Sequence, residues 1–438
     1  MRKLQQDHLV VGFALFAMFF GAGNLIFPPY LGLLTGSRSV PALIGFLISG
    51  IGLPLLGVMA CGQIGGTFIH MSARVGKGFS LAATSALILA IGPALAIPRT
   101  AATTYELAVQ PLLPSVPPLL SAGFFFLVTA LFVLKPSNIV DNVGRILTPG
   151  LLFVLAVIIM RGLLVPIGPV VDTGFAQPFA YALREGYQTM DAMAAVIFAG
   201  IILSAARDRG YTGGEVKRLV LGAGLVAATG LAFVYGGLIY LGSQASTFFR
   251  ADVPRTALFL AIARRELGAV GGVVLALAVA LACLTTAIGL MSAGASFFSK
   301  YIFRERVSYR SLVIAMSLVS ALIASSGVKE IVALAVPVLT VLYPVVITLI
   351  ALTLMGDWAG EVASWRSATY TALVVSTLET LGSLTRSPLL QTLLGFLPFA
   401  ASGFAWVLPT VAAFLVGQAY GWLQRKELAS DTAESRLR

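Results

Sequence analysis

The sequence predicts an all-α integral membrane protein with about twelve membrane-spanning helices. Hydrophobic residues make up 58% of the 438-residue chain and charged residues only 11%, and the mean hydropathy is +0.94. A water-soluble globular protein needs many more polar residues than this to cover its surface. Apolar runs of about 20 residues, enough helix to cross about 30 Å of hydrocarbon, recur along the whole chain.

About twelve such runs follow one another from one end of the chain to the other. The first run continues past any plausible signal-peptide core without a small-residue cleavage site, so we expect the N-terminus to be retained. The expected helix cores are residues 9–34, 41–61, 80–103, 118–134, 144–165, 191–206, 218–242, 269–297, 310–325, 331–355, 367–383 and 399–424.

Basic residues are distributed unevenly between the segments that separate these runs. With both termini in the cytoplasm, 19 of the 29 lysine and arginine residues fall on the inner side, among them Lys135 and Arg145. This excess follows the positive-inside rule. The net charge of +11 therefore reflects topology and indicates no nucleic-acid partner. The outer segment between the seventh and eighth runs is an exception, which we interpret as a solvated loop; an amphipathic surface helix is the alternative. Its basic residues are Arg250, Arg255, Arg264 and Arg265.

The sequence contains no pattern that would indicate an enzyme or a bound cofactor. No Walker sequence, HExxH, GxSxG or CxxC stands in a suitable context. His8 and His70 lie near the ends of runs and are not placed to serve a nucleophile. Cys61 and Cys283 lie inside runs and far apart, so we expect small apolar residues and not a disulfide.

The first apolar run is interrupted by "GAGNLIFPP", residues 21–29. A helix break inside a bilayer leaves unpaired carbonyl and N–H groups, which are tolerated only where they line a cavity or bind a ligand. A close helix-packing surface or a simple kink is the alternative. The carbonyl groups that the break frees suit a cation and belong to Ala17, Met18, Phe19 and Phe20. The freed N–H groups suit a carboxylate and belong to Ala22, Gly23 and Asn24.

The sixth run contains a possible counterpart of this break. Gly200 stands at the centre of "AAVIFAGIIL", residues 194–203, where an inverted five-helix repeat would place it. On this basis we expect a first five-helix repeat, a second and inverted repeat, two additional helices and a polar cytoplasmic tail. Their expected ranges are 1–165, 190–355, 367–424 and 425–438.

The eighth run contains two adjacent hydroxyl groups in "ALACLTTAIG", residues 280–289. Thr285 and Thr286 follow Ala282 at i+3 and i+4 and so share its helix face. Hydroxyls in membrane helices usually bond to a carbonyl of their own helix, which is the structural alternative. Opposite a broken helix, two hydroxyls and three carbonyls form a neutral cage of oxygens that suits a monovalent cation.

Three segments together resemble the bacterial branched-chain amino acid:cation symporters, the LIVCS family. They are "FALFAMFFGAGNLIFPPYLG" (13–32), "GPALAIPRTAATTYE" (92–106) and "LACLTTAIGLM" (281–291). The resemblance covers essentially the whole chain and implies membership of the amino acid–polyamine–organocation superfamily, with a LeuT-type fold of 5+5 inverted repeats and broken first and sixth helices.

The resemblance also implies roles for particular residues. The substrate carboxylate would meet the backbone of Ala22, Gly23 and Asn24. Its amino group would be received by Phe198, Ala199 and Gly200. A sodium site would be formed by Ala17, Phe20, Ala282, Thr285 and Thr286.

One position departs from the pattern of LeuT-type sodium symporters. The arginine of their outer gate should follow the break in the first span, and Phe27 stands there instead. Arg99 and Glu106 on the third run are seven residues apart, which puts them on one face but about 10 Å apart, too far to pair directly. We interpret both as interfacial; a position along the permeation path is the alternative.

The sequence thus predicts a secondary transporter that imports leucine, isoleucine and valine with sodium across the bacterial inner membrane. A proton-coupled symporter is the main alternative and would need a titratable group near the cation site. A channel or a sensor is a further alternative. A channel needs a continuous polar lining that these runs lack, and a sensor would usually carry a signalling domain.

Overall fold

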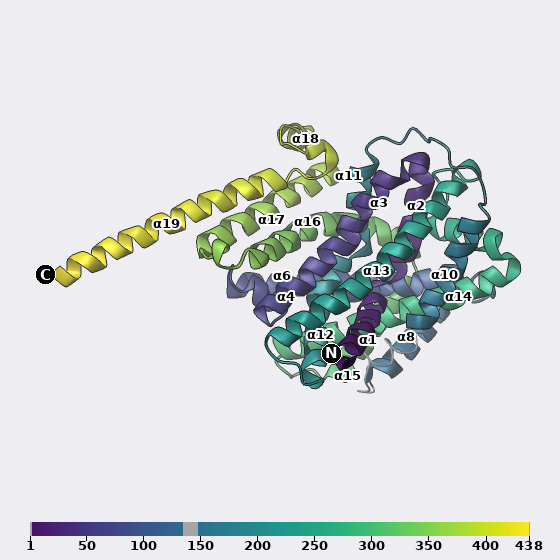
Figure 1. The fold of residues 1–438 in the computed structure, drawn as a ribbon, viewed down its shortest axis with the longest axis horizontal. Helices are drawn as coiled ribbons and strands as arrows, with labels where there is room; N and C mark the ends of the chain where they lie inside the picture. Colours follow the sequence, from purple (N-terminus) through teal and green to yellow (C-terminus); the bar gives the residue numbers. More distant parts are fainter. Residues whose placement is uncertain (1, 135–147, 438) are drawn as a thin grey trace. The chain divides into compact units, whose positions relative to one another are not determined.

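The computed structural model describes residues 2–134 and 148–437, in which every regular element is a helix (Figure 1). The first elements in chain order are α1 (Arg2–Phe19), α2 (Ala22–Thr35), η1 (Gly36–Arg38), α3 (Ser39–Leu47), η2 (Ile48–Gly52), α4 (Leu53–Ile64), α5 (Phe68–Ser72), α6 (Lys77–Leu89), η3 (Ala90–Ala94), α7 (Ala96–Thr104), η4 (Tyr105–Val109), α8 (Pro118–Leu134) and α10 (Thr148–Leu164). The others are α11 (Pro178–Glu185), η6 (Gly186–Thr189), α12 (Asp191–Asp208), α13 (Gly214–Gln244), η7 (Ala245–Thr247), α14 (Arg255–Phe297), η8 (Phe298–Ile302), α15 (Tyr309–Ala324), α16 (Val328–Met355), η9 (Gly356–Ala359), α17 (Val362–Thr385), α18 (Pro388–Gly395), η10 (Ala400–Ser402) and α19 (Val407–Leu437).

The described parts of the expected apolar runs lie mostly on helices or on consecutive helices, which confirms the all-α fold class. The start of the fifth run at 144, with Lys135 and Arg145, lies outside the described residues. By length and composition five of the described helices can cross a membrane, or six if the two halves of one bent pair count as a single span. Shorter apolar helices occupy further expected positions: Gln6–Phe19, Pro118–Leu134, Leu152–Leu164 and Tyr309–Ala324.

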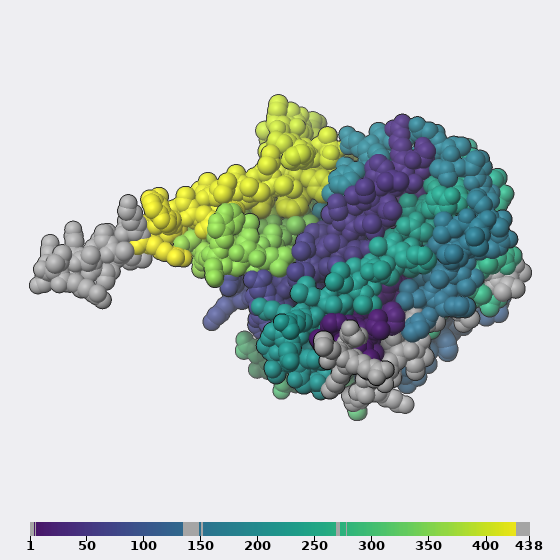
Figure 2. All heavy atoms as spheres, viewed as in Figure 1, coloured from purple at the N-terminus to yellow at the C-terminus, as the bar shows by residue number. Residues whose placement is uncertain are grey.

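The chain divides into two compact units. The first consists of Met1–Gly62 and Ser85–Val336, and the second of Gln63–Thr84 and Pro337–Arg438. In the first unit, α3 and α13 lie side by side on the face that Figure 2 shows. Large apolar side chains stand outward on this unit, such as Phe124, Leu225 and Leu318, which are 68%, 67% and 63% exposed. Such a surface suits contact with lipid and not with water.

In the second unit, α17 and α19 pack along each other (Figure 1). The Ser367 hydroxyl on α17 donates to the carbonyl of Ala413 on α19 at 2.7 Å. The helix α19 continues to Leu437. Residues 425–437, expected as a separate polar tail, are therefore helical.

The first membrane span is broken where the sequence predicts it. The helix α1 ends at Phe19, and α2 begins at Ala22 after Gly21, whose backbone is extended (φ −111°, ψ −163°). The side chain of Asn24 accepts the Gly21 N–H at 3.1 Å. This hydrogen bond satisfies one of the donors that a helix start leaves without a backbone partner.

Glycine also allows α2 to approach α13 closely. A Cβ atom added to Gly32 would lie 1.9 Å from the Ile239 carbonyl oxygen, and one added to Gly242 would lie 1.9 Å from the Pro29 carbonyl oxygen. Any larger residue at either position would force the two helices apart. Backbone contact of this kind is typical of helix pairs in membranes.

The sixth span is broken too, but not at Gly200. Its two halves, Pro178–Thr189 and Asp191–Asp208, meet at an angle of 42°. Met190 between them has a left-handed backbone (φ 65°, ψ 11°), which is uncommon for a residue other than glycine. The expected break at Gly200 is wrong, because α12 runs uninterrupted through that residue. The expected repeat boundary at 190 falls inside this broken span.

The basic segment between the seventh and eighth runs is helical from Arg255 onward, and the expected solvated loop is limited to the stretch before it, where Arg250 is exposed. The helix α14 begins at Arg255 and bends at Gly268, which has a left-handed backbone (φ 63°, ψ −148°). Before the bend, Leu258 and Phe259 are fully buried while Arg264 is exposed. This stretch is therefore amphipathic, as the alternative interpretation of the segment required.

Candidate functional site

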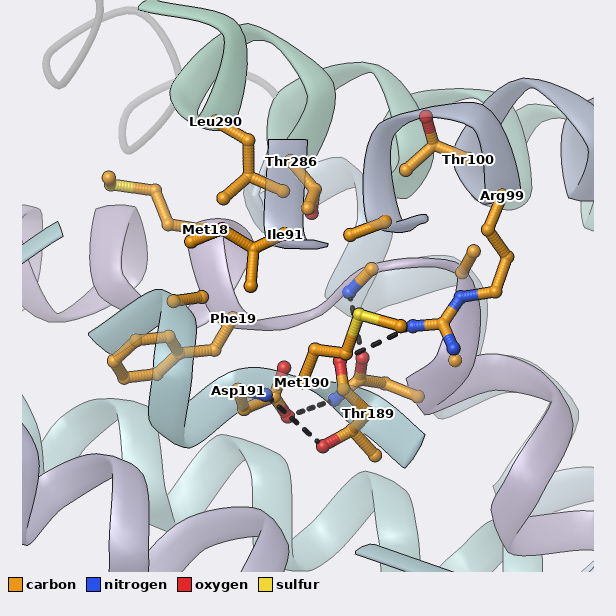
Figure 3. A pocket seen from close by; sticks show the side chains of 16 residues that line it. Met18, Phe19, Ile91, Arg99, Thr100, Thr189, Met190, Asp191, Thr286 and Leu290 are labelled. Carbon is orange, nitrogen blue, oxygen red and sulfur yellow. Dashed lines mark hydrogen bonds between the residues drawn. The ribbon is translucent and has the colours of Figure 1, made fainter. Parts of the chain in front are cut away.

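A cavity lies where the two broken spans face each other (Figure 3). Its volume is about 20 Å³, which leaves room for about one ordered water. From the first span, the lining residues are Met18, Phe19 and residues 21–24. From the third span, they are Ile91, Ala96, Arg99 and Thr100. The others are Thr189, Met190, Asp191, Ala194, Thr286 and Leu290. The apolar part of this wall includes two methionines, whose flexible side chains can adapt to different ligand shapes.

The five expected cation ligands come together beside this cavity. The Thr285 hydroxyl oxygen lies 3.0 Å from the carbonyl oxygen of Ala282 and 3.2 Å from that of Ala17. The Thr286 hydroxyl oxygen lies 3.5 Å from the carbonyl oxygens of Ala17 and Phe20. Both threonines are buried, at 2% and 8% exposure. The group is a cluster of neutral oxygens, the ligand type that hard cations prefer.

The side chain of Asn24 connects three helices, a role that the sequence interpretation missed. Its amide nitrogen donates to the carboxylate of Asp191 on α12 at 2.6 Å and to the hydroxyl of Tyr235 on α13. Its amide oxygen accepts the N–H of Gly21 at the break. Asn24 is 1% exposed, so these contacts are made away from water.

Asp191 is a buried acid at the break of the sixth span, and the sequence interpretation overlooked it. It is the first residue of α12 and is 3% exposed. Its Oδ2 atom lies 2.6 Å from the Asn24 amide nitrogen and 3.5 Å from the Tyr235 hydroxyl. A carboxylate inside a membrane span is by default a functional candidate. The position of Asp191 in "GYQTMD", at the start of an apolar run, could have identified it from the sequence.

Arg99 also lines the cavity, so its expected interfacial position is wrong. It is 3% exposed. Its guanidinium donates to the carbonyl oxygens of Gln188 at 2.6 Å and Thr189 at 3.4 Å. These carbonyls end the first half of the broken sixth span, where the helix dipole favours a cation. A Cβ atom added to Gly23 would lie 3.1 Å from Arg99 Nη2, so the guanidinium also lies against the start of α2.

Glu106 does not share this environment. It is partly exposed, and its carboxylate accepts hydrogen bonds from the hydroxyl of Thr256 at 2.8 Å and from the N–H of Val328 at 2.9 Å. It lines two further cavities of about 380 and 710 Å³. Glu106 therefore connects the C-terminal end of the third span to neighbouring segments, away from Arg99.

Two arginines surround Phe27, the residue that replaces the expected gate arginine. The Arg255 guanidinium lies over the rings of Phe27 and Tyr30 at 4.7 Å from each centroid, and that of Arg99 lies over Phe27 at 5.6 Å. Arg255 also pairs with Glu185 at the end of α11, with an N–O distance of 2.6 Å. The ion pair and the aromatic rings, which we call the Arg255 cluster, join α2, α11 and α14.

The three residues expected to receive the amino group do not line the cavity. Phe198, Ala199 and Gly200 lie within α12, well past the break at Met190. The ring of Phe198 packs against that of Phe19, with centroids 6.4 Å apart. The carbonyls of an unbroken helix are already paired within the helix, so this segment offers a ligand few backbone groups.

Comparison with known proteins identifies the family. A profile of the family described as "Branched-chain amino acid transport protein" matches residues 4–424. The branched-chain amino acid transport system 2 carrier protein of Pseudomonas aeruginosa is 36% identical over 417 residues, covering 94% of this chain and 95% of that protein. The branched-chain amino acid permease BraB of Bacillus subtilis is 36% identical over 433 residues, covering 94% and 95%.

A solved structure shows the fold. Mhp1, a nucleobase–cation symport transporter in a closed conformation with bromovinylhydantoin bound, is similar at a TM-score of 0.65 and 14% identity. The similarity covers 96% of this chain and 93% of Mhp1, and confirms the LeuT-type fold. The chain therefore belongs to the branched-chain amino acid transport protein family, whose members are named as transporters and not as enzymes.

Proposed function

We propose that this protein imports leucine, isoleucine and valine across the bacterial plasma membrane, driven by sodium. The observation that carries the proposal is the cluster of five neutral oxygens beside the cavity, built from the end of the first half of the broken span and from α14. A bound cation there would pin α14 to the end of α1. Binding of the cation and of the substrate would then stabilise the same arrangement, which is what coupling requires.

The substrate would bind in the neighbouring cavity, which would have to widen, because in this structure it has room for only about one ordered water. The N–H groups of Ala22, Gly23 and Asn24 at the start of α2 would meet its carboxylate, because a helix N-terminus favours an anion. The apolar side chain would lie among Met18, Phe19 and Leu290. Both chain termini would lie in the cytoplasm.

Proton coupling is the alternative that one observation favours. Asp191 is a titratable group in the wall of the same cavity as Thr286, whereas the sequence interpretation found no such group near the cation site. We prefer sodium because the oxygens closest to the break belong to carbonyl and hydroxyl groups, which are neutral and do not titrate in the physiological pH range.

The deciding experiment is leucine uptake into proteoliposomes under separately imposed gradients. We expect an inward sodium gradient at equal pH to drive accumulation of radiolabelled leucine, and an inward proton gradient without sodium to drive none. Accumulation under the proton gradient alone would assign the coupling to protons. Failure to accumulate leucine under either gradient would refute the proposed function.

A further inference from the structure

The carbonyl groups at the break of the sixth span are occupied by a side chain of the protein itself. In a broken helix these carbonyls could receive a substrate ammonium group, because they carry the negative end of the helix dipole. Here Arg99 donates to Gln188 O and Thr189 O. A substrate ammonium at this position would meet a buried guanidinium of the same charge, so the ammonium needs another partner.

Asp191 directly follows Met190, the residue at this break, and faces the same cavity (Figure 3). We propose, on the basis of the proposed function, that the carboxylate of Asp191 receives the α-ammonium group of the substrate and so restricts transport to molecules with a free amino group. A carboxylate has about four acceptor positions. The hydrogen bonds from Asn24 and Tyr235 both go to Oδ2 and orient the group without changing its charge.

Arg99 supplies a positive charge for the carboxylate end of the substrate. Its guanidinium lies against Gly23 at the start of α2, where the freed N–H groups already favour a carboxylate. The cavity wall thus carries one buried positive and one buried negative side chain. A zwitterion brings a matching charge to each, whereas a molecule without an amino group would leave the Asp191 carboxylate with its hydrogen bonds but with no opposite charge from the ligand, in a site away from water, at a cost.

A purely structural role for Asp191 makes a different prediction. As the first residue of α12 it lies at a helix N-terminus, where an acid is stabilising, and it also fixes Asn24. Loss of the charge would then disturb the shape of the cavity and weaken the binding of every ligand. Leucine and its analogues would be affected equally, because no ligand group would have lost a specific partner.

The test compares ligands that differ by one group, in the purified full-length protein. Asp191→Asn keeps the shape and can still accept from Asn24. Affinities for leucine, for 4-methylpentanoate, which lacks the amino group, and for leucinol, which lacks the carboxylate, are measured from the rise in unfolding temperature with ligand concentration. We expect wild type to prefer leucine over 4-methylpentanoate by at least about tenfold, and Asp191→Asn to lose that factor through weaker leucine binding. The preference for leucine over leucinol should be unchanged.

Two controls separate the possible outcomes. Tyr235→Phe removes a hydrogen bond to Asp191 but no charge, and should shift both leucine and 4-methylpentanoate by the same factor. If Asp191→Asn is not monodisperse, Asp191→Ser gives the same comparison. If wild type binds leucine and Asp191→Asn still prefers leucine over 4-methylpentanoate, the role of Asp191 is overturned and the proposed function stands. A wild type that binds no leucine overturns both.

Discussion

Replacement of Thr285 by valine tests the cation site directly. Valine keeps the branched shape and removes one hydroxyl, which lies 3.0 Å from Ala282 O and 3.2 Å from Ala17 O. A hydrogen bond within a membrane protein contributes about 0.6 kcal/mol on average. If Thr285 serves only packing, the variant should lose about that much stability and keep its transport properties.

If Thr285 is a cation ligand, the variant also loses sodium affinity, and this loss is larger than the loss of stability. One of five oxygens disappears from a buried, neutral site, and interactions with a charged group are worth about 1.5–3 kcal/mol each. Sodium binding should therefore weaken by about tenfold to a hundredfold. Because the coupling between sodium and substrate is reciprocal, leucine affinity should also fall and should recover partly at high sodium.

The measurement is the sodium concentration at half-maximal leucine uptake in proteoliposomes. Thr129→Val is the matched control, since Thr129 is buried and donates to Phe125 O within its own helix at 2.8 Å. The control should leave the sodium dependence unchanged at a comparable cost in stability. A well-folded Thr285→Val protein with the sodium dependence of wild type would refute the site.

Further predictions concern the Arg255 cluster, helix packing, specificity and topology. Arg255→Gln should raise the KM for leucine several-fold, and exchanging the charges of Arg255 and Glu185 should restore part of the loss; an unchanged KM in uptake assays would show that the ion pair does not act in gating. Gly32→Ala should lower the unfolding temperature, at a cost of about 1–3 kcal/mol, because its Cβ would overlap Ile239 O; an unaltered melting curve contradicts this. Glutamine should compete poorly with labelled leucine, since burying its amide unpaired costs about 1–3 kcal/mol; equal competition would exclude an apolar pocket. A C-terminal reporter should be active in the cytoplasm, and activity only outside the cell would overturn the topology.

The break in the first span and the oxygen cluster of the proposed cation site could be predicted because their signals are local. Glycine, asparagine and proline in an apolar run mark a break, and the i, i+3, i+4 spacing of Ala282, Thr285 and Thr286 places three groups on one helix face. The structure brings these residues to Ala17 and Phe20, as expected.

The break in the sixth span could not be found in the same way. It lies at Met190, in a polar segment that precedes the apolar run, so a search inside the run selected Gly200 instead. A glycine within a membrane helix keeps its hydrogen bonds and need not break it. The position of Arg99 was missed for another reason: its partners at Gln188 and Thr189 are remote in sequence, and helical periodicity cannot say which face meets them.

The glycine contacts between α2 and α13 restrict how these two helices can move. With Gly32 and Gly242 set against backbone carbonyls, the helices cannot slide along each other unless one backbone is lifted over the other. We therefore expect α2 and α13 to move as a rigid block. The Arg255 cluster then opens through its other members, and the start of α14 has a natural hinge at Gly268, whose positive φ already interrupts the helix. We expect rotation about this hinge to carry Arg255 away from Phe27.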